Sequence, residues 1–389
     1  EDDMLKNPEK EDLQDKLFPI PYDWEEEWKD MPEYHNWQEA DPKITATFKF
    51  RNEEDFQRFK NIISQYGYDG AKVFDGEQSL TKKQAWFPHN EQPRFYRYKS
   101  KEQMNPKYPI YIVSKGRYDI NPTSRALIKM GVPFRMVVEE QEYEQYCNLV
   151  GKENVLILPK RYQDEYDTFW KDDDPRVGPG GARNFAWEHS IEEGFDYHWV
   201  LDDNIDGFRR FNQNMQIWCE NGFVFSLTEK FVERYENIAQ AGFQYDKFIP
   251  TKDLRPPYTL NTRIYSCLLI KNDIPFRWRG RYNEDTDLSL RILKSGLCTI
   301  QMNAFLQDKK TTTKMKGGNT DEFYDEEGTK NKSQMLKDMH PDLVELSFRF
   351  NRHHHFVDYS PFKKNKLIKK KNIHIKDGVN DHGIELVKI

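Results

Sequence analysis

The spacing of apolar residues alternates between two periods in the middle of the chain. Short apolar runs typical of strands stand at 108–114, 134–140 and 155–159,. Amphipathic segments typical of helices separate them, near 124–130 and 142–150,. Strands that alternate with short helices predict a parallel sheet with right-handed crossovers, and ligands of such sheets bind at the carboxyl ends of the strands.

A glycine-rich helix start and a strand with an acidic end follow. The sequence GPGGARN at 178–184 predicts the beginning of a helix, and a strand is expected directly after it at 197–201,. The helix is expected to bury an apolar face that contains Phe185, Ala186 and Ile191. The strand runs into three polar residues, Asp202, Asp203 and Asn204.

The pattern predicts three further elements before residue 300. An amphipathic helix is expected where apolar residues recur at Phe231, Tyr235, Ile238 and Ala239,. Residues 264–270 predict a buried strand. A last helix ends at Gly296 and carries acids in its first turn, where the helix dipole favours them,.

The N-terminal part of the chain departs from this pattern. Residues 1–40 are rich in acids, but tryptophans among them indicate that this arm packs against the protein. A strand at 44–50, a helix that stops at Gly67 and a short strand at 84–87 predict a small α+β module,. The basic, aromatic connector at 93–101 is either an edge strand or a segment that binds phosphates.

These changes of pattern divide the chain into four expected parts. They are an acidic arm at 1–40, an α+β module with its connector at 41–100, a catalytic α/β domain at 101–345 and a basic extension at 346–389. The extension contains six lysines and no acid between Lys363 and Lys371.

Composition and charge exclude several classes of protein. The 389 residues carry a formal charge of −6, from 59 basic and 65 acidic side chains, which argues against a uniformly basic nucleic-acid binder,. The acids are concentrated in 1–40 and lysines in the C-terminal extension, so the total does not count against DNA as a partner. Apolar residues at 37% and aromatic residues at 14% suffice for a folded core,.

The sequence also gives expectations for the cellular compartment. No run of about 18 apolar residues is present, so no membrane-spanning segment is expected,. The polar, acidic N-terminus is unlike a secretory signal,. The four cysteines form no C-x-x-C pair, which favours free thiols in a reducing compartment,. We expect a cytoplasmic protein.

Common catalytic motifs are missing from the sequence. It contains no P-loop, no dinucleotide fingerprint after the first strand, no H-E-x-x-H and no G-x-S-x-G,. Hydrolases with a nucleophilic serine, P-loop enzymes and Rossmann dehydrogenases therefore lose most of their support.

Two acidic clusters remain as candidates for chemistry. Asp202 and Asp203 follow a buried strand, where two carboxylates can hold Mg²⁺ or Mn²⁺, although acidic pairs are also common in surface turns,. Glu284 and Asp285 follow the basic run RWRGRY, and an acid held against arginines can serve as a general base,. For Asp287 we favour a simple role at the helix start,.

Two basic sites accompany the acids. The glycines of GPGGARN either allow close packing or bring backbone N–H groups and Arg183 to a diphosphate,. Lys115 and Arg117 stand at the end of the first strand, where a nucleotide would lie in an α/β sheet,.

Four motifs in order, PIYIVSKGR, GPGGARN, VLDDN and YNEDTDLSLR, resemble a known family. Their arrangement is similar to that of the inverting GT-A glycosyltransferases of family two. More narrowly, the chain resembles the TET-associated DNA glycosyltransferases, which are mostly encoded by bacteriophages. The resemblance covers 108–308. It implies a GT-A-type nucleotide-sugar-binding sheet with Rossmann-like βα units.

The resemblance also assigns roles to particular residues. It implies that Asp285, next to Glu284, is the catalytic base. A metal and ribose site would contain Asp202 and Asp203, and the sequence D-D-N where D-x-D is usual leaves open which aspartate binds the metal. A third metal ligand would be Asp308 or one of the histidines at 353–355. The nucleotide-sugar pocket would be lined by Ser114, Lys115, Arg117, Glu139 or Glu140, Arg183 and Asp202.

The function implied by the resemblance is metal-dependent, inverting sugar transfer. The donor would be a UDP-sugar, the cofactor Mn²⁺ or Mg²⁺, and the acceptor 5-hydroxymethylcytosine, or 5-hydroxymethyluracil, in DNA; a phage-encoded enzyme would act in the host cytoplasm. The sequence leaves the oligomeric state open, and the sugar could be glucose, N-acetylglucosamine or a pentose. Alternatives are a GT-A enzyme with a protein or glycan acceptor, a sugar-1-phosphate nucleotidyltransferase, and a DNA-binding protein without enzymatic activity.

Overall fold

A computed structural model describes most of the chain. The described residues are 23–36, 48–64, 95–170, 178–249, 255–310, 325–349 and 352–389. Of the expected N-terminal module they include the helix α3 (Glu53–Ser64), whose Phe56 and Phe59 rings contact Phe50. The strand expected at 84–87 lies outside the described residues, as does most of the strand expected at 44–50, whose end at 48–50 is not a strand.

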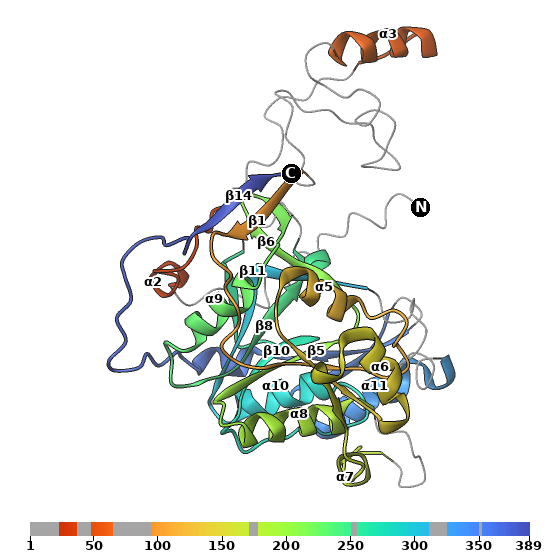
Figure 1. Cartoon of the computed structure of the whole chain (residues 1–389), viewed down its shortest axis with the longest axis vertical. Helices are drawn as coiled ribbons and strands as arrows, with labels where there is room; N and C mark the ends of the chain where they lie inside the picture. The colour runs from red at the N-terminus through yellow and green to blue at the C-terminus, as the bar shows by residue number, and fades with distance from the viewer. Residues whose placement is uncertain are drawn as a thin grey trace.

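The core of the structure is a ten-stranded mixed sheet (Figure 1). Its strand order is β4-β3-β2-β5-β10-β8-β11-β6-β7, and β9 pairs with β11. The strands are β2 (Ile110–Val113), β3 (Arg135–Val138), β4 (Val155–Ile157), β5 (Tyr197–Asp202), β6 (Ile205–Asn212), β7 (Met215–Trp218), β8 (Ile238–Tyr245), β9 (Tyr258–Leu260), β10 (Cys267–Lys271) and β11 (Cys298–Lys309).

The sheet is parallel only in part. Strands β4, β3, β2 and β5 are parallel, as predicted. Beyond β5 the sheet is mixed, because β10 pairs antiparallel with both β5 and β8, whereas β8 and β11 are parallel to each other. At the far edge, β6 and β7 form a hairpin whose turn residues, Gln213 and Asn214, both have positive φ, the geometry that matches the twist of paired strands,.

Helices cover both faces of the sheet. The alternation along β5 shows the two faces: Trp199 and Leu201 belong to one apolar cluster, and Val200 belongs to the other,. Helices α5 (Pro122–Met130), α6 (Tyr143–Val150) and α9 (Phe223–Val232) pack on the first face. Helices α8 (Gly180–Glu192) and α10 (Glu284–Lys294) pack on the second, and Figure 1 shows them side by side.

One predicted helix is wrong. The segment expected to be helical around 231–239 contains the end of α9 and the beginning of β8. Strand β8 lies between β10 and β11 and is buried from both faces, so it lacks the alternation that identifies a half-buried strand,. The apolar face expected for α8 is also wrong at Ile191, which is 38% exposed, while the neighbouring Trp187 is fully buried.

Small elements complete the fold. The connector strand β1 (Tyr96–Ser100) pairs with β14 (Ile384–Lys388) in a separate two-stranded sheet, which confirms its interpretation as an edge strand. Strands β12 (Val344–Arg349) and β13 (Arg352–Val357) form another pair beside α11 (Asp325–Met339). The short helices are α2 (Trp24–Glu27), α7 (Arg161–Asp164), η3 (Glu140–Glu142), η4 (Lys152–Asn154), η5 (Asp246–Phe248) and η8 (Ser360–Lys364).

The described part of the acidic arm packs on the body of the protein. Trp28 is buried among the rings of Phe231, Tyr258 and Phe305. The guanidinium of Arg234 donates hydrogen bonds to backbone carbonyls of the arm, at Glu27, Lys29 and Asp30. The expectation that this arm contacts the protein is therefore confirmed for residues 23–36.

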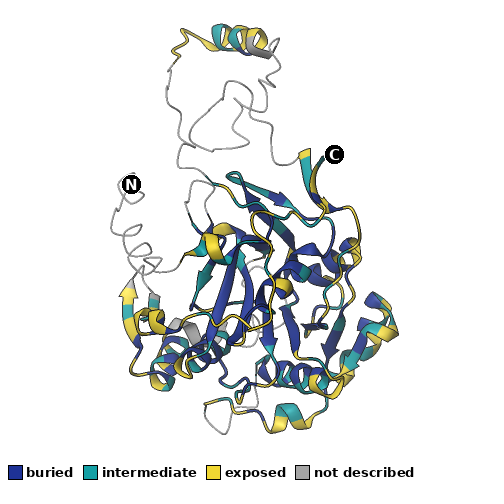
Figure 2. Cartoon of the chain, turned by 90° about the vertical axis from the view of Figure 1, so that its left-hand side faces the viewer, coloured by how far each residue is buried: buried dark blue, intermediate teal, exposed yellow. Residues whose placement is uncertain are grey.

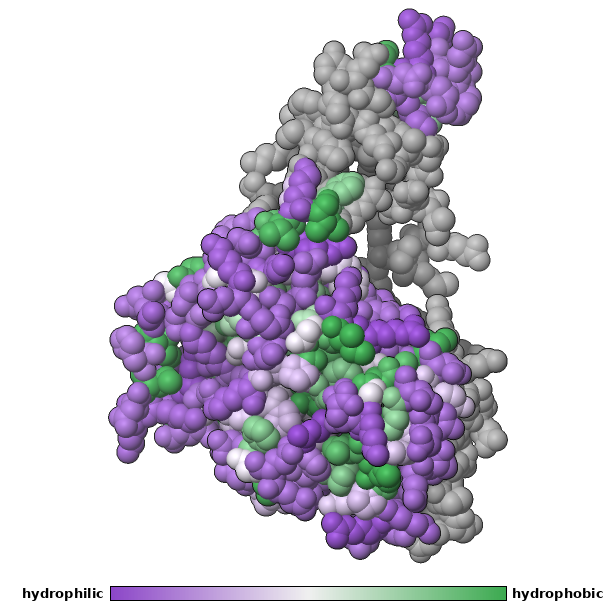
Figure 3. All heavy atoms as spheres, in the orientation of Figure 1, coloured by the Kyte–Doolittle hydropathy of each residue, from purple (hydrophilic) through white to green (hydrophobic). Residues whose placement is uncertain are grey.

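The described surface is mainly polar. Figure 2 shows the sheet strands as the buried interior, and the face in Figure 3 is largely hydrophilic. Among the described residues, no helix is both long and apolar enough to cross a membrane. All four cysteines have free thiols, as predicted.

The burial of Trp28 gives a test of the role of the arm. We expect Trp28→Ala to lower the free energy of unfolding by about 3–5 kcal/mol, because it leaves a cavity among three aromatic rings. Urea denaturation measures the change. The control Val379→Ala removes an apolar side chain that is 64% exposed and should shift stability by less than about 0.5 kcal/mol,. Equal effects of the two substitutions would contradict the packing of the arm.

Candidate active site

A cavity of about 800 Å³ opens at the carboxyl ends of the parallel strands. Ser114 follows β2, Glu139 follows β3 and Asp202 ends β5, and all three line it. This is the location that the alternation of strands and helices predicts for a ligand. From the other side, the first turn of α10 contributes Glu284 and Asp285.

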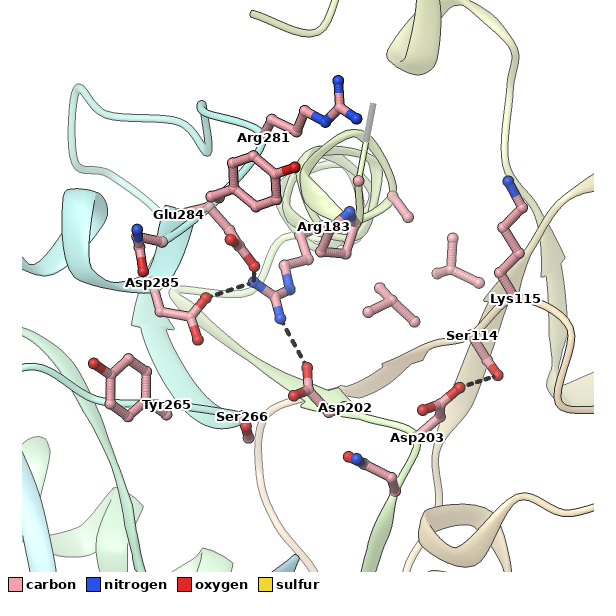
Figure 4. Close-up of a pocket in the computed structure, with 18 of the residues that line it drawn as sticks. Ser114, Lys115, Arg183, Asp202, Asp203, Tyr265, Ser266, Arg281, Glu284 and Asp285 are labelled. Carbon is pink, nitrogen blue, oxygen red and sulfur yellow. Dashed lines mark hydrogen bonds and ion pairs between the residues drawn. The ribbon is translucent and has the colours of Figure 1, made fainter. Parts of the chain in front are cut away.

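The guanidinium of Arg183 connects three carboxylates on the wall of this cavity (Figure 4). Its Nη1 lies 2.9 Å from Glu284 Oε1 and 2.8 Å from Asp285 Oδ1, and its Nη2 lies 2.8 Å from Asp202 Oδ1. The guanidinium also lies over the Trp278 ring, 4.6 Å from its centre,. Strand β5, helix α8 and helix α10 therefore meet at one buried cation.

The carboxyl groups around Arg183 differ in charge. Burial, together with the charge of Asp285, raises the pKa of Glu284 to about 8, although Arg183 opposes the shift,. Burial alone would also raise the pKa of Asp202, but Lys309 and Arg183 hold it well below its ordinary value. At neutral pH, Glu284 is therefore mostly protonated, and Asp202 is ionised.

The glycines before Arg183 allow close packing. A Cβ atom on Gly180 would lie 1.9 Å from the hydroxyl oxygen of Tyr166, and one on Gly181 would lie 2.5 Å from the carbonyl oxygen of Tyr162. The packing explanation of the GPGGARN motif thus holds for these two positions. Gly178 has a φ of +69° and lines the cavity, so the loop before α8 also shapes the site,.

The two aspartates at the end of β5 face different partners. Asp203 is buried and forms an ion pair with Arg117, and the Ser114 hydroxyl donates to it at 2.6 Å. Burial raises the pKa of Asp203, while Arg117 opposes this shift. The Nδ2 of Asn204 donates to the carbonyl of Lys310. Asp203 thus ties the loop after β2 to the end of β5.

The loop after β2 supplies the other predicted pocket residues. Lys115, Arg117 and Glu139 line the cavity, and Lys115 Nζ lies 3.2 Å from Glu139 Oε1. Glu140 begins the short helix η3 and is absent from the cavity wall. Of the two alternatives that the sequence leaves open, Glu139 is the residue at the cavity.

The residues predicted to bind metal do not come together. Asp202 faces Arg183 and Lys309, and Asp203 faces Arg117. Asp308 lies outside the cavity wall, with its Oδ2 2.6 Å from Arg209 Nη2. No three histidine, cysteine, aspartate or glutamate side chains in the described ranges are grouped as a metal site. The predicted ligands therefore do not fit a divalent cation in this arrangement.

Of the three histidines at 353–355, the other candidates for a metal ligand, one lies at the cavity. His355 lines it, and burial together with the charges of Lys332 and Arg263 lowers its pKa to about 4. It is therefore neutral at physiological pH, and two cationic side chains lie near it. The sequence favoured a solvent-exposed surface position for these histidines, whereas His355 lies on the cavity wall.

The sequence did not predict the opposite wall of the cavity. Lys309 ends β11 and lies 2.6 Å from Asp202 Oδ2. The rings of Tyr245 and Tyr265 are stacked 6.2 Å apart, and the Tyr245 hydroxyl lies 2.7 Å from Ser266 Oγ. Lys309 follows the predicted ligand Asp308 directly, and of these two neighbours Lys309 is the one that lines the cavity.

The fold and the site together define an α/β enzyme whose cavity holds acids and cations beyond the ends of parallel strands. A comparison with family models matches residues 108–318 to the TET-Associated Glycosyltransferase family. The chain belongs to this family, as the sequence motifs indicated, and is a glycosyltransferase. A search of curated proteins found no match.

The raised pKa of Glu284 predicts a pH dependence of stability. Between pH 4.5 and about 8 the folded protein keeps a proton that an unfolded glutamate has lost, so stability falls as the pH rises through this range,. Glu284→Gln removes the titration, and its stability relative to wild type should increase from pH 5 to pH 8. Urea unfolding at stepped pH measures the difference.

A control separates the effect of Glu284 from the general loss of a carboxylate. Glu385 lies on the exposed side of β14, so Glu385→Gln reports what a surface glutamate contributes under the same conditions. If the two variants follow parallel curves against pH, the proton does not reside on Glu284.

Proposed function

We propose that the protein transfers a sugar from a UDP-sugar to the hydroxyl of 5-hydroxymethylcytosine, or 5-hydroxymethyluracil, in DNA, with inversion at the anomeric carbon. One observation carries the proposal. Asp202 and Asp285 lie on opposite sides of the Arg183 guanidinium at the cavity wall, so a donor-binding carboxylate and a candidate base share one fixed cation.

The donor half of the site would lie at the ends of β2, β3 and β5. Ser114, Lys115 and Arg117 come from the loop after β2, and Glu139, which lines the cavity, would accept hydrogen bonds from a ribose or a uracil. Asp202 would face the ribose side of the diphosphate. Arg183 lines the cavity, and its guanidinium would add positive charge near the phosphate oxygens.

The acceptor half would lie at the start of α10. Asp285 takes the proton from the acceptor hydroxyl while the oxygen of that hydroxyl attacks the anomeric carbon of the sugar. The bond between that carbon and the diphosphate oxygen breaks on the opposite face, and the electron pair leaves with UDP. Glu284, mostly protonated at neutral pH, contacts the same Nη1 of Arg183 as Asp285 does, without adding a full negative charge.

A divalent cation was expected from the resemblance to GT-A enzymes. Mn²⁺ or Mg²⁺ would stabilise the diphosphate by acting as a Lewis acid. Since Asp202, Asp203 and Asp308 each face a basic side chain, no step is assigned to a cation.

The choice of DNA as the acceptor rests on the family and on charge. The family name links the enzyme to TET proteins. The six lysines between Lys363 and Lys371 are all exposed, on a segment anchored to the body by the buried Phe362 and Asn365. Such a fixed row of cations would give salt-dependent contacts with phosphates. A protein or glycan acceptor and a sugar-1-phosphate nucleotidyltransferase are the competing functions.

The general base is tested by Asp285→Asn. The substitution removes the proton acceptor but keeps the shape of the side chain, so we expect transfer to fall at least about 100-fold while UDP binding is retained. Mass spectrometry of hydroxymethylated duplex DNA measures transfer, and calorimetry measures binding. Asp273→Asn is the matched control, because this side chain is 72% exposed and pairs with Lys271. Transfer by Asp285→Asn at the wild-type rate would refute the assignment.

The acceptor and donor are tested with a panel of substrates. We expect a mass increase of one sugar on DNA that contains 5-hydroxymethylcytosine or 5-hydroxymethyluracil, and none on unmodified DNA, with one member of a UDP-sugar panel. Transfer that occurs only to a glycan or protein would reject the DNA acceptor. Formation of a nucleotide-sugar from UTP and a sugar-1-phosphate would instead identify a nucleotidyltransferase.

A further inference from the structure

The side chain of Lys309 occupies the place at Asp202 where a metal ion was expected. Its Nζ lies 2.6 Å from Asp202 Oδ2 and 2.6 Å from Ser266 Oγ, and its side chain is 15% exposed. The ammonium group carries a positive charge at neutral pH, and the carboxylate of Asp202 beside it favours that charge,.

Both oxygens of Asp202 are already bound by cations. Arg183 Nη2 lies 2.8 Å from Oδ1, and Lys309 Nζ lies 2.6 Å from Oδ2. A metal ion at this carboxylate would have to share its two oxygens with two buried cations, whose charges repel it,. An ammonium group has three N–H donors, and among the described residues Asp202 and Ser266 engage two of them, so one can point to a ligand in the cavity,.

The local backbone directs Lys309 into the cavity. Pairing between β11 and β6 shifts at this point, because Asp308 pairs with Gly207 and Lys309 pairs with Ile205. The extra residue at this shift, Asp206, belongs to β6, whereas successive side chains of β11 alternate, so Asp308 and Lys309 point to opposite sides,. Asp308 is held on the other side by Arg209, and Lys309 lines the cavity.

The charge on the cavity wall suits a diphosphate. Among the described residues, eight lysine and arginine side chains line the cavity against six aspartate and glutamate side chains. Even with every acid ionised, the wall carries an excess of two positive charges. The diphosphate of a UDP-sugar carries two negative charges, so these side chains can neutralise it.

We infer that Lys309, together with Arg183, performs the role of the divalent cation, and that the enzyme binds UDP-sugars and releases UDP without a metal ion. The inference rests on the proposed function. As the bond to the anomeric carbon breaks, negative charge develops on the departing diphosphate oxygen. Lys309 and Arg183 stabilise that charge from fixed positions on the cavity wall,.

The first test uses the wild-type protein and needs no substitution. UDP affinity by calorimetry and sugar transfer by mass spectrometry are measured in EDTA and in Mn²⁺. We expect UDP affinity and transfer to change less than about twofold between the two conditions. UDP binding or transfer that is lost in EDTA and restored by Mn²⁺ would overturn the inference.

The second test replaces the cation. Lys309→Met keeps the length of the side chain without its charge, and we expect transfer to fall about 100-fold or more, with weaker UDP binding in EDTA. Lys309→Arg should recover part of the loss. Lys310→Met is the matched control, because the neighbouring lysine pairs with Asp206 at 3.0 Å outside the cavity and should leave both measurements unchanged.

The outcomes separate this inference from the proposed function. Unchanged UDP binding in Lys309→Met, checked for folding by thermal unfolding, would overturn the role of Lys309. If that variant does not fold, Lys309→Arg and the wild-type comparison in EDTA decide the question. Metal-independent UDP binding without transfer to any acceptor would support Lys309 and reject the proposed reaction. Absence of UDP binding under both conditions would reject both.

Discussion

The buried guanidinium of Arg183 is the interaction on which the site depends. Three carboxyl groups from β5 and α10 converge on it, and Asp202 also contacts Lys309. Acids this close together repel one another, and burial makes each charge more costly. Arg183 is thus what allows a strand end and a helix start, both acidic, to form one wall of a cavity.

The same interaction explains why the cavity contains two kinds of carboxyl group. A single guanidinium cannot neutralise three negative charges, so one of the three retains a proton at neutral pH. Lys309 and Arg183 keep Asp202 charged, whereas burial and the charge of Asp285 raise the pKa of Glu284. The charge state of each group therefore follows from its own burial and its own neighbours.

The sequence predicted the first half of the sheet well and the second half less well. Strands β2, β3, β4 and β5 have short apolar runs bounded by polar loops, and their order fixes where the cavity lies. Strand β8 was mistaken for a helix because it is buried on both sides. The antiparallel insertion of β10 depends on long-range pairing, which no local pattern reveals.

The residues that line the cavity were predicted well from the sequence, but the contacts between their side chains were not. Motifs at strand ends and helix starts identified Ser114, Lys115, Arg183, Asp202 and Asp285, all of which line the cavity. The residues predicted to bind a metal do not form one group, because the orientation of each side chain depends on its partner, such as Arg117 for Asp203. Neither these partners nor a shift in strand pairing can be read from residue types.

The end of β11 has a consequence for how this site can change. Asp308 and Lys309 are adjacent and have opposite charges, and the alternation of side chains along β11 decides which of them faces the cavity,. A deletion or insertion of one residue in β11 would exchange them and reverse the sign of the charge presented to a ligand, with almost no change in composition. The register of β11 therefore determines whether a positive or a negative side chain faces the ligand.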